Sequence, residues 1–241
     1  MHPQLFQFGR LILPTYGFLV AVGTILSLLV CVRTARLLSL DTEKIWSVAL
    51  LAVVTALFGR ILLNFLRWPA YAYSLGLAAV AIPAAAYAAH LGLPIRRTAD
   101  AVAPGLALWS AVAAMACLEA GCDYGTSTSL PWAVIFRSST ALGATPLAVP
   151  LHPVQLYASL IEFLLFAFLL WLLHRPHHDG EILGAWLFLS GLSSSLLTVV
   201  RGDLVTADHF AQLMVTQLMS AAMVLGGGLL WIRSRRVSYG R

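Results

Sequence analysis

The chain has 241 residues, of which 60% are hydrophobic and only 10% are charged, and its mean hydropathy is +0.85. Soluble domains carry about 25% charged residues, so this composition excludes a soluble protein and a soluble enzyme with a single membrane anchor. The net charge of +5 comes mainly from arginines near the ends of apolar segments, without the basic stripe and interleaved aromatic residues of a nucleic-acid binder. The sequence therefore predicts an all-α, polytopic membrane protein.

About seven apolar segments are long enough to cross a bilayer, which takes roughly 20 residues. The expected spans are Thr15–Val32, Ile45–Leu66, Ala72–Leu91, Ala101–Leu118, Val154–Leu173, Ile182–Val200 and Phe210–Ile232. No cleavable signal is expected, because residues 1–10 are polar and few. We expect one transmembrane domain over residues 1–241, in which the apolar connection 119–151 is a loop on the membrane surface.

The basic residues predict the orientation of the chain. An outward N-terminus and an inward C-terminus put ten of them on the cytoplasmic side and five on the outer side, as the positive-inside rule requires. The inner ten are Arg33, Arg36, Lys44, Arg96, Arg97, Arg175, Arg233, Arg235, Arg236 and Arg241, and the outer five are Arg10, Arg60, Arg67, Arg137 and Arg201. The positive-inside rule does not account for the five arginines on the outer side, so their presence there needs another explanation.

Three polar side chains stand where the fifth span begins, on the same outer side. His152, Gln155 and Tyr157 surround Pro153, a residue that suits the first turn of a helix. Polar groups are costly at the mouth of a membrane helix unless they bind something. The stretch indicates either a headgroup or substrate site, or an interfacial aromatic belt with a helix-start proline.

Arg60 and Arg201 are the candidates for binding a phospholipid phosphate. Gly59-Arg60 lies within the second span and Arg201 lies where the sixth span should end. The planar guanidinium matches the geometry of phosphate. The alternative is that both arginines reach toward the membrane surface and pair with Asp203 or Asp208.

Two carboxylates fall within or beside spans. Asp100 is expected to be the N-cap of the fourth span. Glu162 lies in the fifth span, where a lone carboxylate is a functional candidate, and pairing with an arginine is the alternative.

The segment Cys117–Gly125 gathers two thiols and the carboxylates Glu119 and Asp123 at a helix end. The spacing of Cys117 and Cys122 does not fit a zinc knuckle, and the nearby acids disfavour a thiolate nucleophile. A disulfide on the outer face is an open alternative. Plain buried thiols are the favoured interpretation.

Several motifs along the chain resemble those of the bacterial prolipoprotein diacylglyceryl transferases. His152-Pro153-Val154-Gln155-Leu156-Tyr157 resembles the most specific motif of that family, His-Pro-x-Gln-Leu-Tyr. The other similar segments are Pro14–Gly17, Gly59-Arg60, Asp100–Pro104, Pro131–Val134, Val200–Asp203 and Gln217–Ser220.

The resemblance implies an enzyme that moves the diacylglyceryl group of phosphatidylglycerol to the lipobox cysteine of a prolipoprotein, forming a thioether. The expected partners are phosphatidylglycerol or another anionic phospholipid and a prolipoprotein signal peptide, without nucleic acid, and the expected location is the bacterial inner membrane. No cofactor and no metal are implied. The catalytic candidates are His152, Glu119 and Asp123, and the substrate-binding candidates are Arg60, Arg201, Gln155, Tyr157 and Tyr16.

The chain departs from the family pattern at several polar positions. The His-Gly-Gly segment of the family is Ser74-Leu75-Gly76 here, and the signature Gly-Arg-x-Gly-Asn-Phe falls on Ala113–Leu118. The acid that follows the signature falls on Cys122, and an arginine of the sixth span falls on Ser194. Two alternatives therefore stay open: a paralogue that uses the same lipid cleft for another acceptor, and a non-catalytic lipid-binding scaffold.

Overall fold

The protein is described here by a computed structural model, which covers residues 4–8, 11–65, 72–137, 145–204 and 210–236. The side chains of residues 4–8, 11–12, 60, 63–65, 72–78 and 236 lie outside that description. The helices are α1 (Thr15–Leu37), α2 (Thr42–Phe65), α3 (Ala72–His90), α4 (Ile95–Ala120), α5 (Val154–Leu173), α6 (Glu181–Thr198) and α7 (Phe210–Arg236). The strands are β1 (Gln4–Phe8), β2 (Leu11–Pro14), β3 (Val134–Ile135) and β4 (Pro150–Leu151).

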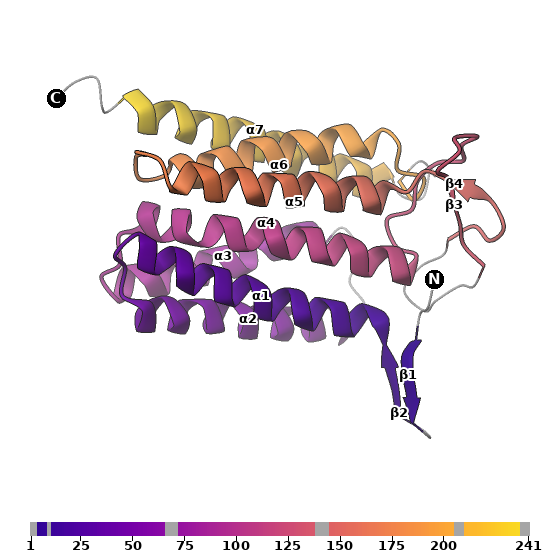
Figure 1. Ribbon diagram of the computed structural model, residues 1–241, viewed down its shortest axis with the longest axis horizontal. Helices are drawn as coiled ribbons and strands as arrows, with labels where there is room; N and C mark the ends of the chain where they lie inside the picture. Colours follow the sequence, from indigo (N-terminus) through magenta and orange to yellow (C-terminus); the bar gives the residue numbers. More distant parts are fainter. Residues whose placement is uncertain (1–3, 9–10, 66–71, 138–144, 205–209, 237–241) are drawn as a thin grey trace.

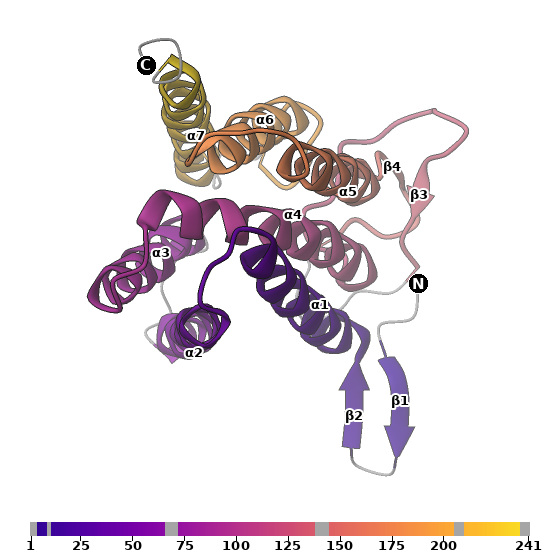
Figure 2. The ribbon, with the colours of Figure 1, turned by 60° about the vertical axis from the view of Figure 1, so that its left-hand side comes forward.

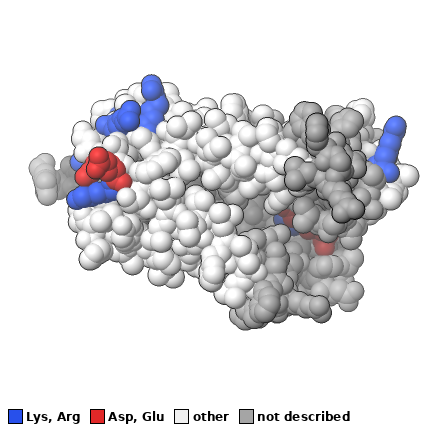
Figure 3. Space-filling model, turned by 90° about the horizontal axis from the view of Figure 1, so that it is seen from below, with Lys and Arg blue, Asp and Glu red and all other residues white. Residues whose placement is uncertain are grey.

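The seven helices lie side by side as a bundle (Figure 1). Within the described residues, every helix except α3 is long and apolar enough to cross a membrane, and α3 contributes a shorter apolar part, Ala79–His90. Charged side chains gather toward the two ends of the molecule, with an uncharged belt between them on the face that Figure 3 shows. The chain is thus a multi-pass, all-α membrane protein, and the prediction of about seven spans is confirmed.

The two ends of the bundle differ (Figure 1). The hairpin end carries the antiparallel pair β1–β2, the pair β3–β4, and the loop that follows α4. The C-terminal end carries the α1–α2 turn and the end of α7. The sequence analysis did not foresee the β1–β2 hairpin, because its two short strands directly precede a transmembrane helix.

Helix α4 is the centre of the bundle, in contact with α1, α3, α5 and α6 (Figure 2). The residues of α4 that are most deeply buried are small: Ala101, Ala103, Pro104, Gly105, Ala107 and Ala111. Small residues let membrane helices approach closely without a hydrophobic driving force. The small residues of α4 thereby let α1, α3, α5 and α6 pack on it.

Hydroxyl groups of α1 hold it against α4. Ser27 Oγ donates to the Gly105 carbonyl at 2.8 Å, and Thr34 Oγ1 donates to the Ala101 carbonyl at 2.5 Å. Hydroxyl side chains commonly form hydrogen bonds between helices in membranes. These bonds fix the register of α1 on α4.

Asp100 is not the N-cap of the fourth span, because α4 begins at Ile95 and Asp100 lies inside it. Its buried carboxylate instead accepts hydrogen bonds from the N–H groups of Gly180 (2.5 Å) and Leu183 (2.8 Å). These are orphan donors of the first turn of α6, which need a partner when they are buried. Asp100 thus caps a different helix from the one that carries it.

Glycines let α6 and α7 approach closely. A Cβ atom at Gly227 would lie 2.5 Å from the Phe188 nitrogen, and one at Gly184 would lie 2.7 Å from the Trp231 nitrogen. Helix α7 is otherwise largely exposed, so this seam is the main attachment of α7 to the bundle.

Candidate functional site at the hairpin end

Helix α4 ends at the hairpin end in a turn that depends on glycine. Gly121 adopts φ of 71°, a left-handed conformation that costs glycine nothing. The Gly121 N–H donates to the Leu118 carbonyl at 3.3 Å, and the Cys122 N–H donates to the Cys117 carbonyl at 3.1 Å. This pair of backward bonds is the Schellman motif, and it brings the side chains of Cys117 and Cys122 together.

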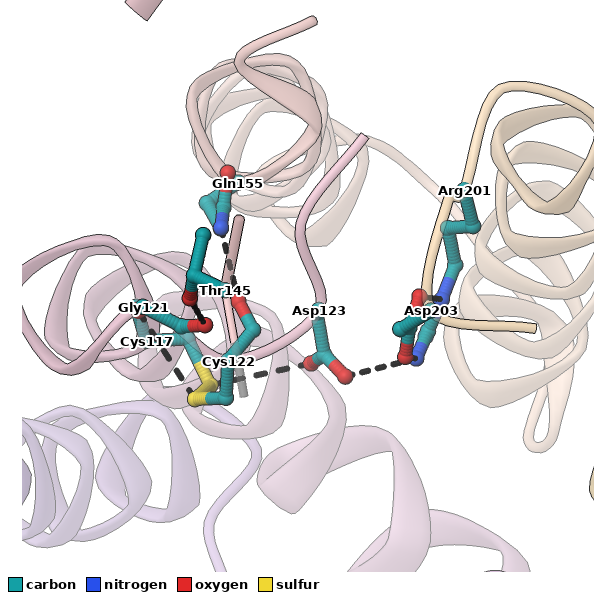
Figure 4. The surroundings of a disulfide bond; sticks show 8 residues. All are labelled: Cys117, Gly121, Cys122, Asp123, Thr145, Gln155, Arg201 and Asp203. Carbon is teal, nitrogen blue, oxygen red and sulfur yellow. Dashed lines mark hydrogen bonds and ion pairs between the residues drawn. A yellow bond between two sulfur atoms is a disulfide. The ribbon is translucent and has the colours of Figure 1, made fainter. Parts of the chain in front are cut away.

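A disulfide joins Cys117 and Cys122 across this turn, with their Cα atoms 5.0 Å apart (Figure 4). The bridge stands where a hydrophobic contact usually accompanies a Schellman motif. The favoured interpretation of two plain buried thiols is therefore wrong, and the disulfide alternative is confirmed. Because the two sulfurs are bonded to each other, neither is a thiolate that could act as nucleophile or bind metal.

Arg201 lies just beyond α6 and holds two carboxylates (Figure 4). Its Nε donates to Asp203 Oδ1 at 3.0 Å, and its Nη2 donates to Asp203 Oδ2 and to Asp123 Oδ1 at 2.6 Å each. Burial lowers the pKa of the guanidinium, but the two carboxylates outweigh burial and raise its pKa above the ordinary value. The alternative that Arg201 pairs with Asp203 is thus confirmed, and the three side chains together carry one net negative charge.

Asp123 is the exposed member of this cluster. Its side chain is 48% exposed, against 18% for Arg201 and 19% for Asp203. Its backbone φ is 54°, a left-handed conformation that aspartate tolerates better than most residues. Asp123 Oδ2 also lies 3.6 Å from Cys117 Sγ. The disulfide turn therefore presents Asp123 to Arg201 on one side and to the exterior on the other.

The three polar residues at the start of α5 contact the loop that follows α4. Gln155 Nε2 donates to the Cys122 carbonyl at 2.7 Å, and Trp132 Nε1 donates to the Tyr157 hydroxyl at 2.8 Å. The His152 ring meets the Tyr157 ring edge-on, with centroids 6.4 Å apart. Pro153 is the residue directly before α5, one position earlier than the first helical turn in which the sequence placed it.

Backbone bonds tie His152 to Arg201 through the segment 124–128. The His152 N–H donates to the Thr126 carbonyl, and the Thr126 N–H donates to the Val200 carbonyl, both at 2.9 Å. Gly125 pairs with Arg201 in an isolated β-bridge. The structure therefore brings together His152, Gln155, Tyr157, Asp123 and Arg201 from three separate parts of the chain.

The remaining predicted residues lie around this group. Glu119 is half-buried in the last turn of α4, and Tyr16 is half-buried at the start of α1. Both helix ends belong to the hairpin end. Arg60 lies in α2, and its side chain falls outside the described part of the chain.

Glu162 lies away from this group, inside α5. It is buried, and Ser190 Oγ of α6 donates to its Oε1. Pairing with an arginine is therefore wrong among the residues that the structure describes, because the partner is a hydroxyl.

Two members of the site are residues that sequence reasoning did not select. Asp203 was considered only as a partner that would occupy Arg201, and Trp132 only as part of a loop segment. The distance in sequence from Trp132 to Tyr157 hides their contact, whereas Asp203 follows Arg201 closely enough for its pairing to be anticipated.

Several polar atoms of the site keep unused hydrogen-bonding capacity within the described residues. His152 Nδ1 and Gln155 Oε1 are buried and have no hydrogen-bond partner within the described residues. A buried polar atom without a partner costs about 1 to 3 kcal/mol. The Tyr157 hydroxyl accepts from Trp132, which leaves its own proton to donate. The site can thus bind a polar group from the membrane surface by both donors and acceptors.

Known proteins that resemble this chain along its length carry one name. A family model described as prolipoprotein diacylglyceryl transferase matches residues 3–233. The phosphatidylglycerol–prolipoprotein diacylglyceryl transferase of Clostridium tetani is 26% identical, over 94% of this chain and 95% of the relative. A second enzyme of that name from Clostridium perfringens is 25% identical over 90% and 89%, and one from Finegoldia magna is 26% identical over 92% and 91%. Because the match covers almost every helix, the loop after α4 and the His152–Tyr157 stretch, the chain belongs to the prolipoprotein diacylglyceryl transferase family.

Proposed function

We propose that this protein transfers the diacylglyceryl group of phosphatidylglycerol to the lipobox cysteine of prolipoproteins, in the bacterial inner membrane. The observation that carries the proposal is the family match over residues 3–233. The polar site at one end of the bundle supports it, because both substrates present their reacting groups at a membrane surface.

In the proposed reaction the sulfur of the lipobox cysteine attacks the glyceryl CH₂ carbon that bears the phosphate. A carbon–sulfur bond forms, the carbon–oxygen bond breaks, and glycerol phosphate leaves with the electron pair. The thiol proton must go to a base. His152 fits that part, because its Nδ1 is buried without a partner among the described residues and an imidazole nitrogen can accept a proton.

Arg201 would stabilise the leaving phosphate through its remaining donor group. Two carboxylates already hold Nε and Nη2, so they fix the plane of the guanidinium and leave Nη1 for the phosphate. Arg201, Asp123 and Asp203 together carry a net negative charge, which repels the phosphate. A second cation is therefore required to bind the phosphate. Arg60 is the candidate for that role, while Glu119 and Asp123 would take over polar functions at the reacting centre.

Gln155, Tyr157 and Tyr16 would position the lipid. Gln155 and Tyr157 are anchored to the loop after α4 by Cys122 and Trp132, and Tyr16 lies at the start of the neighbouring α1. Side chains that are already held in position reduce the entropy that is lost when the two substrates are aligned for reaction.

The test is expression of the chain in bacteria depleted of their own transferase. Mass spectrometry of a reporter lipoprotein should show diacylglyceryl thioether on its cysteine. Arg201→Gln should lower the amount formed about a hundredfold or more, the usual cost of removing one group that stabilises developing charge. Arg137→Gln is the matched control, because Arg137 is an exposed arginine in the same loop region.

Absence of the thioether with correctly inserted wild-type protein would reject the proposed activity. His152→Asn, which keeps the polarity of the position without its basicity, should also abolish transfer. Full activity of this variant would remove His152 from the role of base.

A second candidate, lipid binding without turnover, is favoured by one observation: Arg201 is already neutralised by Asp123 and Asp203. This candidate predicts that phospholipid copurifies with the protein, that Gln155→Ala reduces the copurified amount, and that the cellular lipidome and the reporter lipoprotein stay unchanged. A new modified acceptor in the lipidome would instead indicate a paralogue with a different acceptor.

A further inference from the structure

A groove separates α1 from α2 near the turn that joins them at the C-terminal end. Figure 2 shows α1 beside α4 and α2 beside α3, so that the two consecutive helices diverge. The groove has a volume of about 800 Å³, within the range of sites that hold a small ligand or the head of a larger one.

Two arginines border the groove without an ionic partner. Arg33 and Arg36 of α1 line it, and residues three apart on a helix lie on the same face. Both side chains are exposed. Among the residues that the structure describes, the carboxylates form ion pairs only with Arg201 and Arg235, so neither arginine of the groove is neutralised.

The other charged residues near the α1–α2 turn do not pair with Arg33 or Arg36. Asp41 Oδ1 accepts from the N–H groups of Glu43 (3.0 Å) and Lys44 (3.3 Å), which caps α2. Lys44 Nζ donates to the Leu91 carbonyl at 3.0 Å. Glu43 lines the groove without pairing to its arginines. The groove itself therefore carries one net positive charge.

The polarity of the groove changes along its length. The arginines and Thr42 stand near the end of the bundle, and Trp46, one turn further along α2 beside Ser47, has 41% of its surface exposed. Leu29, one turn further into the bundle on α1, is 59% exposed. The groove is therefore cationic at its outer end, then aromatic, then apolar. This order matches the phosphate, the glycerol region and the acyl chains of a phospholipid that lies in the membrane.

We propose that the groove between α1 and α2 binds an anionic phospholipid of the leaflet at the C-terminal end, with Arg33 and Arg36 on the phosphate and Trp46 on the glycerol region. The arginine distribution makes this the cytoplasmic leaflet. Helix α1 has 23 residues, a length of about 34 Å, so the groove and the hairpin-end site serve opposite leaflets. The groove is thus distinct from the site proposed for transfer.

Native mass spectrometry of the full-length protein tests this site. The wild type, released from vesicles of phosphatidylglycerol and phosphatidylcholine, should retain phosphatidylglycerol preferentially. The double variant Arg33→Gln/Arg36→Gln should weaken retention of one such lipid about tenfold, because each basic residue near a membrane contributes to anionic-lipid attraction. Arg175→Gln is the control, an exposed arginine near the C-terminal end that stacks on Trp171 outside the groove, and it should retain the lipid.

A second measurement locates the lipid and does not depend on the arginine variants. Phosphatidylglycerol with brominated acyl chains should quench the fluorescence of Trp46, and the quenched component should be missing in Trp46→Phe. Added soluble glycerol phosphate should leave the quenching unchanged, because the acyl chains are part of the ligand.

Equal retention by the wild type and the double variant would overturn the proposal, as would equal loss in Arg175→Gln. Competition by glycerol phosphate would reassign the groove to a soluble phosphate compound. Both results are independent of transferase activity, which needs the hairpin end.

Discussion

A single residue inside one helix can cap another helix. Asp100 is the clearest case, because its carboxylate on α4 satisfies the first N–H groups of α6. The sequence motif Asp100–Pro104 suggested a cap, and the chemistry was right although the helix was wrong. The sequence could not identify the recipient, because Gly180 and Leu183 lie 80 and 83 residues away.

Asp100→Ala should destabilise the protein by about 2 to 3 kcal/mol, because it leaves one buried and one partly buried N–H group without their charged acceptor. The melting temperature in detergent should fall by about 5 °C or more. Asp179→Asn, an exposed carboxylate in the loop before α6, is the control and should melt like the wild type. Equal melting of Asp100→Ala and the control would contradict the capping role.

The disulfide makes a separate prediction about thiols. Maleimide labelling of the denatured protein should modify one of the three cysteines, Cys31, without reductant and all three after reduction. Mass spectrometry counts the labels, and Cys31→Ser should give none before reduction. Three labels without reductant would show that the bridge does not form.

The spacing Cys117-x-x-x-Gly121-Cys122 contained a signal for this bridge. A glycine one residue before the second cysteine permits the Schellman turn, and the turn itself sets the Cα atoms 5.0 Å apart. The general expectation that cysteines are small buried residues outweighed this signal, although the relevant property was the conformation of the residue between them.

At the scale of elements, hydrophobic length predicted the helices well. The expected fifth span, Val154–Leu173, is the observed α5, and the others differ by a few residues at their ends. Hydrophobic length did not predict polar extensions such as Ile95–Asp100, because a helix can continue beyond its apolar part wherever its ends are packed on neighbours. How the helices pair could not be predicted, since lipid-facing and partner-facing surfaces are equally apolar.

The seam between α6 and α7 makes a prediction with a control on the same helix. Gly227→Ala should destabilise the protein by about 1 to 3 kcal/mol, because its Cβ would meet the backbone of α6 at 2.5 Å. Gly226→Ala should be neutral or slightly stabilising, because a Cβ there meets nothing within 4 Å and alanine favours helix. Melting curves of the two variants in detergent compare them, and an equal response would show that α7 does not pack as described.

At the scale of the whole molecule, the charge bias predicts which membrane face each end meets. In a Cys31→Ser background, Ser129→Cys at the hairpin end should react with an impermeant maleimide in intact spheroplasts. Asp179→Cys should react only after lysis, since both positions are exposed but lie in loops at opposite ends of the bundle. The reverse labelling pattern would invert the orientation and move both proposed lipid sites to the other leaflet.

The candidate site illustrates what a sequence can say about a whole molecule. The residue types were predicted, because polar side chains at span ends are costly unless they are used. Apart from Asp203 beside Arg201, their partners were not, because Asp123, His152 and Arg201 meet through backbone pairing between loops that no local pattern describes.

The closeness of those loops rests on two residues that have no side chain at all. A Cβ atom at Gly202 would lie 2.6 Å from the Gly125 carbonyl oxygen, and one at Gly125 would lie 2.6 Å from the His152 Cβ. Any larger residue at either position would separate Arg201 from Asp123 without altering a single chemical group. A saturation scan scored by lipoprotein modification should therefore rank Gly125 and Gly202 among the most intolerant positions, beside residues that would touch the substrate. Gly125 and Gly202 contribute to the site only by letting the loops approach each other, although neither glycine carries a reactive group.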